Sequence, residues 1–159
     1  MQGSYTPGAE YSGQDLRIGV VCARFNGEIV EAMRVAAQAA LLEFRVAEAD
    51  VTCIHVPGAF ELPLACKVMA GTGKFDGIIA LGCVIRGDTP HFEYVCQGCT
   101  SGIQEASLQS GVPIAFGLLT TDTLEQAVQR STGDSNKGRD AALCVLEMVH
   151  VLKSIPSGG

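Results

Sequence analysis

The chain has 159 residues, a net charge of −6 and only 18% charged residues against 47% hydrophobic ones. The length suits one domain with a substantial core, and the singly scattered Lys and Arg argue against nucleic acid as a partner. No apolar run approaches the roughly 18 residues that cross a membrane, while a charged fraction below the usual value of about 25% favours a homo-oligomer.

Residues 1–15 read "MQGSYTPGAEYSGQD" and lack the basic-then-apolar pattern of a signal peptide. We expect a flexible tail there, followed by a single domain over residues 16–155. The seven cysteines form an odd and dispersed set, mostly inside apolar segments. Such a set favours free thiols in a reducing cytoplasm over a secreted disulfide framework.

Four β-branched apolar runs predict strands, at residues 16–22, 51–56, 77–85 and 112–119. Their near-continuous hydrophobicity indicates strands covered on both faces, as in a parallel sheet. On this reading, His55 in the second strand is a core histidine with satisfied ring nitrogens.

Helical patterns separate and follow these strands, at residues 28–45, 60–70, 90–109, 122–130 and 137–153. Asp122 or Thr123 is a candidate N-cap for the fourth helix, and we expect the last helix to bury Met148 and Leu152. The element order βαβαβαβαα predicts an α/β fold with a parallel sheet between two layers of helices. Ligands of such folds bind beyond the carboxyl ends of the strands, so the turns there should carry the function.

Cys96 and Cys99 form a C-x-x-C pair close to His91. A structural zinc site normally needs a second pair, which the sequence lacks. We therefore expect these cysteines to pack in a core or interface, and we expect no metal.

The turn at residues 86–91 has two readings. In one, Thr89 caps a helix whose first residue is Pro90, and Asp88 lies favourably against the helix dipole. In the other, Gly87 lets backbone N–H groups approach an anion, and His91 in the first turn acts as a general base. The residues alone favour neither reading.

The residues alone also do not decide the function of three further features. Phe25 is either a core plug or a platform for a planar ring. The turn "PGAFE" at 57–61 is a strand-to-helix connection that places Glu61 in the first helical turn. In the loop 130–138, Arg130 and Lys137 either contact an anionic ligand or lie solvated.

Five stretches, in this order, resemble the lumazine synthase family: "ARFN" (23–26), "VPGAFELP" (56–63), "GCVIRGDTPHFEYV" (82–95), "GVPIAFGLLTTDTLEQA" (111–127) and "NKGRDAALCVLEM" (136–148). The resemblance implies a flavodoxin-like three-layer α/β/α sandwich with a four-stranded parallel sheet. It also implies the condensation of 5-amino-6-(D-ribitylamino)uracil with 3,4-dihydroxy-2-butanone 4-phosphate. The products are 6,7-dimethyl-8-ribityllumazine, phosphate and water, and no metal or organic cofactor takes part.

The matching motifs also imply roles for single residues. Phe25 would stack on the pyrimidine, His91 would transfer protons, and the N–H groups of Asp88 and Thr89 would bind phosphate. The ring would meet the backbone of Val84 and Ile85, and the ribityl chain would meet Gly58, Ala59, Phe60 and Glu61. A neighbouring subunit would supply Phe116 and Arg130, with Lys137 near the site, so the resemblance implies an assembly of at least a pentamer.

The chain departs from the family in the loop "RSTGDSNKG" (130–138), which is one residue shorter than usual and has Asp134 near the position of a common Lys. This loop bears on shell closure, so a pentamer, a decamer and a sixty-subunit shell all stay open. A protein that binds a flavin or lumazine, or forms a shell, without turnover is the alternative function. An intact phosphate-binding turn with His91 counts against it.

Overall fold

Four strands form one parallel sheet in the computed structural model, which describes residues 3–157. The strands are β1 (Ile18–Ala23), β2 (Val51–Val56), β3 (Gly77–Ile85) and β4 (Ile114–Thr121). Their spatial order is β2-β1-β3-β4, which matches the first four strands of the flavodoxin-like arrangement. All four predicted strands are confirmed within two residues at each end.

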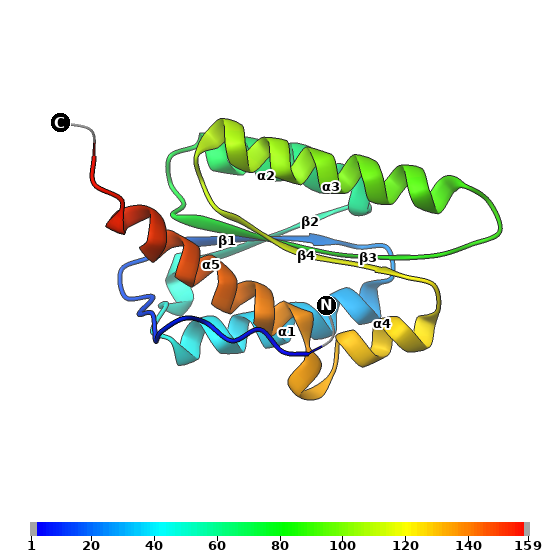
Figure 1. Cartoon of the computed structure of the whole chain (residues 1–159), viewed down its shortest axis with the longest axis horizontal. Helices are drawn as coiled ribbons and strands as arrows, with labels where there is room; N and C mark the ends of the chain where they lie inside the picture. Colours follow the sequence, from blue (N-terminus) through cyan, green and yellow to red (C-terminus); the bar gives the residue numbers. More distant parts are fainter. Residues whose placement is uncertain (1–2, 158–159) are drawn as a thin grey trace.

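Two layers of helices cover the sheet (Figure 1). One face carries α2 (Leu62–Gly71) and α3 (His91–Ser110), and the other carries α1 (Gly27–Glu43), α4 (Leu124–Arg130) and α5 (Lys137–Ser154). Short 3₁₀ turns lie at η1 (Glu48–Asp50), η2 (Ala59–Glu61) and η3 (Gly133–Ser135). The predicted three-layer α/β/α fold is therefore confirmed.

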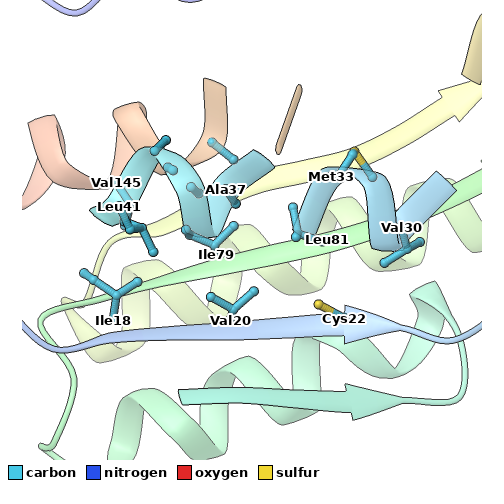
Figure 2. Packing of buried hydrophobic residues seen from close by; sticks show 14 of the residues in the cluster. Ile18, Val20, Cys22, Val30, Met33, Ala37, Leu41, Ile79, Leu81 and Val145 are labelled. Atoms are coloured by element: carbon cyan, nitrogen blue, oxygen red, sulfur yellow. The ribbon is translucent and has the colours of Figure 1, made fainter. Parts of the chain in front are cut away.

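The two central strands divide their side chains between two cores. Val20 and Cys22 of β1 pack toward α1 and α5 together with Leu81 of β3 (Figure 2). Val21, the residue between them, packs toward α2 and α3. This alternation explains the uninterrupted apolar runs, since both faces of β1 and β3 are buried.

Close contact between α1 and α5 depends on Gly138. A Cβ atom at this position would lie 2.1 Å from the carbonyl oxygen of Met33, so only glycine fits. Asn136 is the N-cap of α5. Its side chain accepts hydrogen bonds from the N–H groups of Gly138 (2.8 Å) and Arg139 (3.3 Å). The loop at residues 130–138, which is shorter than is usual in the family, is thus held at its C-terminal end by this cap.

Burial differs from the prediction at the edges of the fold. β2 is an edge strand, and α1 does not cover its outer residues, so Cys53 and His55 are exposed. The interpretation of His55 as a core histidine is wrong. Met148 and Leu152 are 38% and 40% exposed, because α5 turns other residues, such as Val145 and Val149, toward the sheet.

Residues 3–15 contact α5 along its length. Tyr5 hydrogen-bonds Glu147, whose other oxygen accepts from the N–H of Gly8 at 3.1 Å. The ring of Tyr11 lies 5.4 Å from that of His150, and His150 Nε2 is 2.6 Å from the carbonyl of Ser12. His150 therefore has a structural role in holding the N-terminal segment against α5. Among the described residues, no helix is long and apolar enough to cross a membrane.

Candidate functional site

A hollow of about 740 Å³ opens where β1, β2 and β3 end. The turns after these three strands line it, as expected for ligand sites of open α/β sheets. Its lining includes the following predicted site residues: Phe25, Gly58, Ala59, Phe60, Glu61, Val84, Ile85, Gly87, Thr89 and His91. Asp88 lies in the same turn, between two lining residues, and is not itself part of the lining.

Phe25 lies at the mouth of this hollow with 72% of its surface exposed. Its N–H donates to the carbonyl of Pro57 at 3.1 Å, which joins the turn after β1 to the turn after β2. The next residue, Asn26, adopts a left-handed conformation (φ 56°, ψ 46°), and its Nδ2 donates to the carbonyl of Cys83 at 2.8 Å. An exposed ring on a fixed backbone is not a core plug, so the ring platform is the interpretation that fits.

The 57–61 turn is held against α3. The ring of Phe60 packs where a Cβ atom on Gly98 would come within 2.7 Å of its Cε2 atom. Within the turn, the N–H of Glu61 donates to the carbonyl of Gly58 at 3.2 Å. The Glu61 side chain is left facing the hollow as an exposed hydrogen-bond acceptor.

Arg86 fixes the start of the 86–91 turn, a role that no sequence pattern indicated. Its N–H donates to the carbonyl of Thr121 at 2.9 Å, and its Nε donates to Asp122 at 2.7 Å. The guanidinium also pairs with Glu93 and lies 4.3 Å from the centre of the Phe92 ring. Hydrogen bonding to Asp122 and Glu93 raises the pKa of Arg86, and its hydrogen bond lowers the pKa of Glu93, so both groups stay charged.

The rest of this turn presents unpaired backbone donors. Within residues 3–157, no protein group accepts a hydrogen bond from the N–H groups of Gly87, Asp88 or Thr89. Among the described residues, no heavy atom lies within 4 Å of a Cβ position on Gly87, so this part of the chain leaves the space above the turn open. Free N–H groups before a helix of 20 residues form an arrangement that attracts anions.

Helix α3 starts one residue later than predicted. Its first residue is His91, and Pro90 occupies the cap position with no side-chain cap. The hydroxyl of Thr89 accepts only a long contact of 3.4 Å from the His91 N–H. Thr89 is therefore a weak cap, and the imidazole of His91 stands exposed at the wall of the hollow. By contrast, Thr123 is the cap of α4: its hydroxyl accepts from the N–H of Gln126 at 3.2 Å, and its own N–H donates to Gln126 Oε1 at 3.3 Å.

The remaining predicted site residues gather elsewhere. Phe116, Arg130 and Lys137 line a second hollow of about 600 Å³ beside the edge strand β4 and the start of α5. Arg130 Nη1 donates to the carbonyl of Gln126 at 3.0 Å, and Lys137 Nζ lies 2.9 Å from Asp140. The two hollows share no lining residue. One copy of the chain thus carries two separate parts of the predicted site.

Several lining residues were not anticipated. The first hollow also includes Pro57, Cys83, Phe92, Tyr94 and Val95, and the second includes Tyr5, Asp140 and Cys144. Phe92, Tyr94 and Val95 lie within the stretch 82–95 that resembles the family, but the resemblance implied no role for them. No sequence signal joined Tyr5 to a site on α5, because it belongs to a segment expected to be a tail.

Comparison with protein-family models gives one match of nearly full length. Residues 15–153 match the model described as 6,7-dimethyl-8-ribityllumazine synthase. The matched span includes both hollows except for the N-terminal residues of the second.

Proposed function

The chain belongs to the 6,7-dimethyl-8-ribityllumazine synthase family, and we propose that it catalyses the condensation of 5-amino-6-(D-ribitylamino)uracil with 3,4-dihydroxy-2-butanone 4-phosphate. The reaction forms an imine, releases phosphate and closes the second ring with loss of water. These steps need orientation and proton transfer more than a covalent nucleophile. Both substrates are small molecules, and the proposed site uses neither a metal nor an organic cofactor.

The observation that carries this proposal is the combination of an aromatic platform and an anion cradle in one hollow. Phe25 offers a flat exposed face beside the strand end that carries Val84 and Ile85. A pyrimidine stacked on Phe25 would meet the backbone of this strand end, and its ribityl chain would extend toward Glu61 and the 58–60 backbone.

Phosphate binding is assigned to the turn at residues 87–89. Its unpaired N–H groups suit a phosphate because each is an unsatisfied donor at the positive end of a helix dipole. This placement puts the leaving group beside the imidazole of His91, on the same wall of the hollow. His91 then moves protons during imine formation, phosphate loss and ring closure, as a general acid–base group.

The separation of the two hollows supports a site completed by a second copy. Phe116, Arg130 and Lys137 are absent from the lining of the first hollow. We assign them to the site of a neighbouring subunit, where Arg130 would add a positive charge near the phosphate. Exposed apolar side chains, including Leu64, Val68 and Leu108, suit burial between subunits. We propose a pentamer or a larger assembly of pentamers, which sedimentation velocity and electron microscopy would size.

The decisive experiment mixes the two substrates with purified protein and follows the fluorescence of the lumazine product. A rate above the spontaneous condensation is expected. Product formation at the uncatalysed rate, together with tight binding of the lumazine, would instead identify a carrier or shell protein.

A further inference from the structure

Three ligand-type side chains come together on the neighbouring strands β1 and β2. Cys22 lies opposite His55 in the parallel register, and Cys53 lies opposite Val20. The two cysteine sulfurs and a ring nitrogen of His55 all lie within 4.8 Å of one another. The sequence positions 22, 53 and 55 have no spacing typical of a metal motif, so only the strand register reveals the cluster.

The separation of the sulfurs distinguishes a metal site from a disulfide. Cys22 Sγ lies 3.8 Å from Cys53 Sγ. Two thiolates on a tetrahedral zinc ion, each at about 2.3 Å, stand about 3.8 Å apart. A disulfide requires about 2.05 Å. The pair is therefore already at the separation that zinc needs. The exposed ring of His55, with a nitrogen within 4.8 Å of both sulfurs, has to move closer to form a zinc–nitrogen bond of about 2.0 Å.

The three side chains differ in burial, which allows one to be held in place while the others stay accessible to an ion. Cys22 is buried under α1, close to Val30 and Met33 (Figure 2), so its position is fixed. Cys53 and His55 are exposed on the edge strand, so an ion can enter from solvent. One fixed ligand and two accessible ones leave a fourth, solvent-facing position for water.

Two charged groups face the cluster from α1. Arg34 donates to Glu31 through Nε at 2.8 Å and Nη2 at 2.6 Å, and its Nη1 donates to Gln38 at 2.7 Å. The pair is neutral as a unit, so it does not repel a divalent cation. Both cysteines are free, and binding of the ion would displace their thiol protons to solvent, because the thiolate is the form that binds metals.

We propose that Cys22, Cys53 and His55 form a binding site for zinc or a similar thiophilic divalent cation. Two thiolates balance the charge of the ion, and the neutral imidazole completes three protein ligands. None of the three residues lines the proposed reaction hollow, so the ion takes no part in the condensation. It ties the edge strand β2 to β1 and stabilises that edge, because an ion that binds only the folded chain shifts the unfolding equilibrium.

The test uses the full chain, reduced with a phosphine and stripped with a chelator, and titrates it with Co²⁺ as a spectroscopic probe. We expect a thiolate-to-cobalt charge-transfer band and the intense visible bands of tetrahedral Co²⁺, both removed by added Zn²⁺. Cys53→Ser and His55→Gln should each weaken binding by at least about tenfold, the lower bound reported for loss of even an outer-shell contact. Because both positions are exposed, these variants should still fold, and circular dichroism can verify this.

Cys96→Ser and Cys144→Ser are the matched controls, because both are partly exposed free cysteines outside the cluster. They should leave the cobalt spectrum and the Zn²⁺ affinity unchanged. A cobalt complex without thiolate bands would overturn the proposal, as would bands that survive in Cys53→Ser or disappear in Cys144→Ser. These readouts need no substrate, so they are independent of the proposed activity.

Discussion

Arg86 and Asp122 connect the turns that follow β3 and β4: Nε of Arg86 donates to Oδ1 of Asp122 at 2.7 Å. The same guanidinium pairs with Glu93 in the first turn of α3. Since the unpaired N–H groups of residues 87–89 lie between these anchors, Arg86 positions the proposed phosphate cradle without belonging to its lining.

Replacing Arg86 tests that positioning role. Arg86→Ala should raise the apparent KM for the phosphorylated substrate by about tenfold, equivalent to the roughly 1.4 kcal/mol of one weakened contact, with a smaller change in kcat. Arg86→Lys keeps a charge but loses the forked geometry, so it should recover only part of the loss. Steady-state lumazine fluorescence measures both constants. Equal damage to the KM of both substrates would mean that the whole hollow had collapsed.

His91→Ala should reduce kcat by about a hundredfold, the lower end of the range for general acid–base catalysis. Activity should not vanish, because the substrates also react spontaneously and the rest of the site still orients them. The matched control is His150→Gln, which alters a histidine that contacts Tyr11 and Ser12 and lines neither hollow. Loss of substrate affinity with an unchanged kcat would contradict the proton-transfer role.

Arg130→Ala should raise the apparent KM for the phosphorylated substrate and leave that for the pyrimidine nearly unchanged. Its guanidinium is held by the carbonyl of Gln126 at 3.0 Å, so its direction is fixed in each copy. Arg139→Ala provides the comparison, since Arg139 pairs with Glu43 at 2.8 Å and lines neither hollow. An unaltered KM in Arg130→Ala would show that the shortened loop directs this side chain elsewhere.

Gly138→Ala should destabilise the protein by about 3 kcal/mol, the upper end of the usual cost of overpacking, because a new methyl group cannot share space with the Met33 carbonyl at 2.1 Å. Gly71→Ala is the control. This glycine ends α2, and no heavy atom within residues 3–157 lies within 4 Å of its Cβ position, so alanine there should be neutral or slightly stabilising. Chemical unfolding at matched protein concentration measures both, since assembly adds to the apparent stability.

Alkylation rates should separate the cysteines. The pKa of Cys53 is lowered, so in the metal-free protein its thiolate persists to a lower pH than an ordinary thiolate, and its reaction with iodoacetamide should decline only at that lower pH. Burial raises the pKa of Cys66 to about 12, and it should stay unmodified in the folded chain. Cys22→Ala removes the neighbouring thiol 3.8 Å from Cys53 Sγ and should move the Cys53 profile to higher pH, as peptide mass spectrometry would record.

The sequence predicted the strands and helices well because both faces of β1 and β3 are buried, which leaves a clear hydrophobic pattern. The position of β2 was predicted correctly, but its burial was not. An apolar run such as "VTCIHV" does not reveal that the strand lies at an edge with Cys53 and His55 exposed. Most residues of the first hollow were predictable from turns after strands. The partnership of Arg86 with Asp122 was not, because it depends on the pairing of β3 with β4 over 36 residues of sequence.

The two hollows have a geometric consequence for assembly. Because they share no lining residue, the first hollow of one copy can meet the second hollow of another in a head-to-tail contact. Two copies joined in this way would form one complete site and leave two unmatched halves. Among head-to-tail assemblies of finite size, a closed ring brings every first hollow together with a second hollow, so it has as many complete sites as subunits. The need for complete sites would therefore favour ring closure.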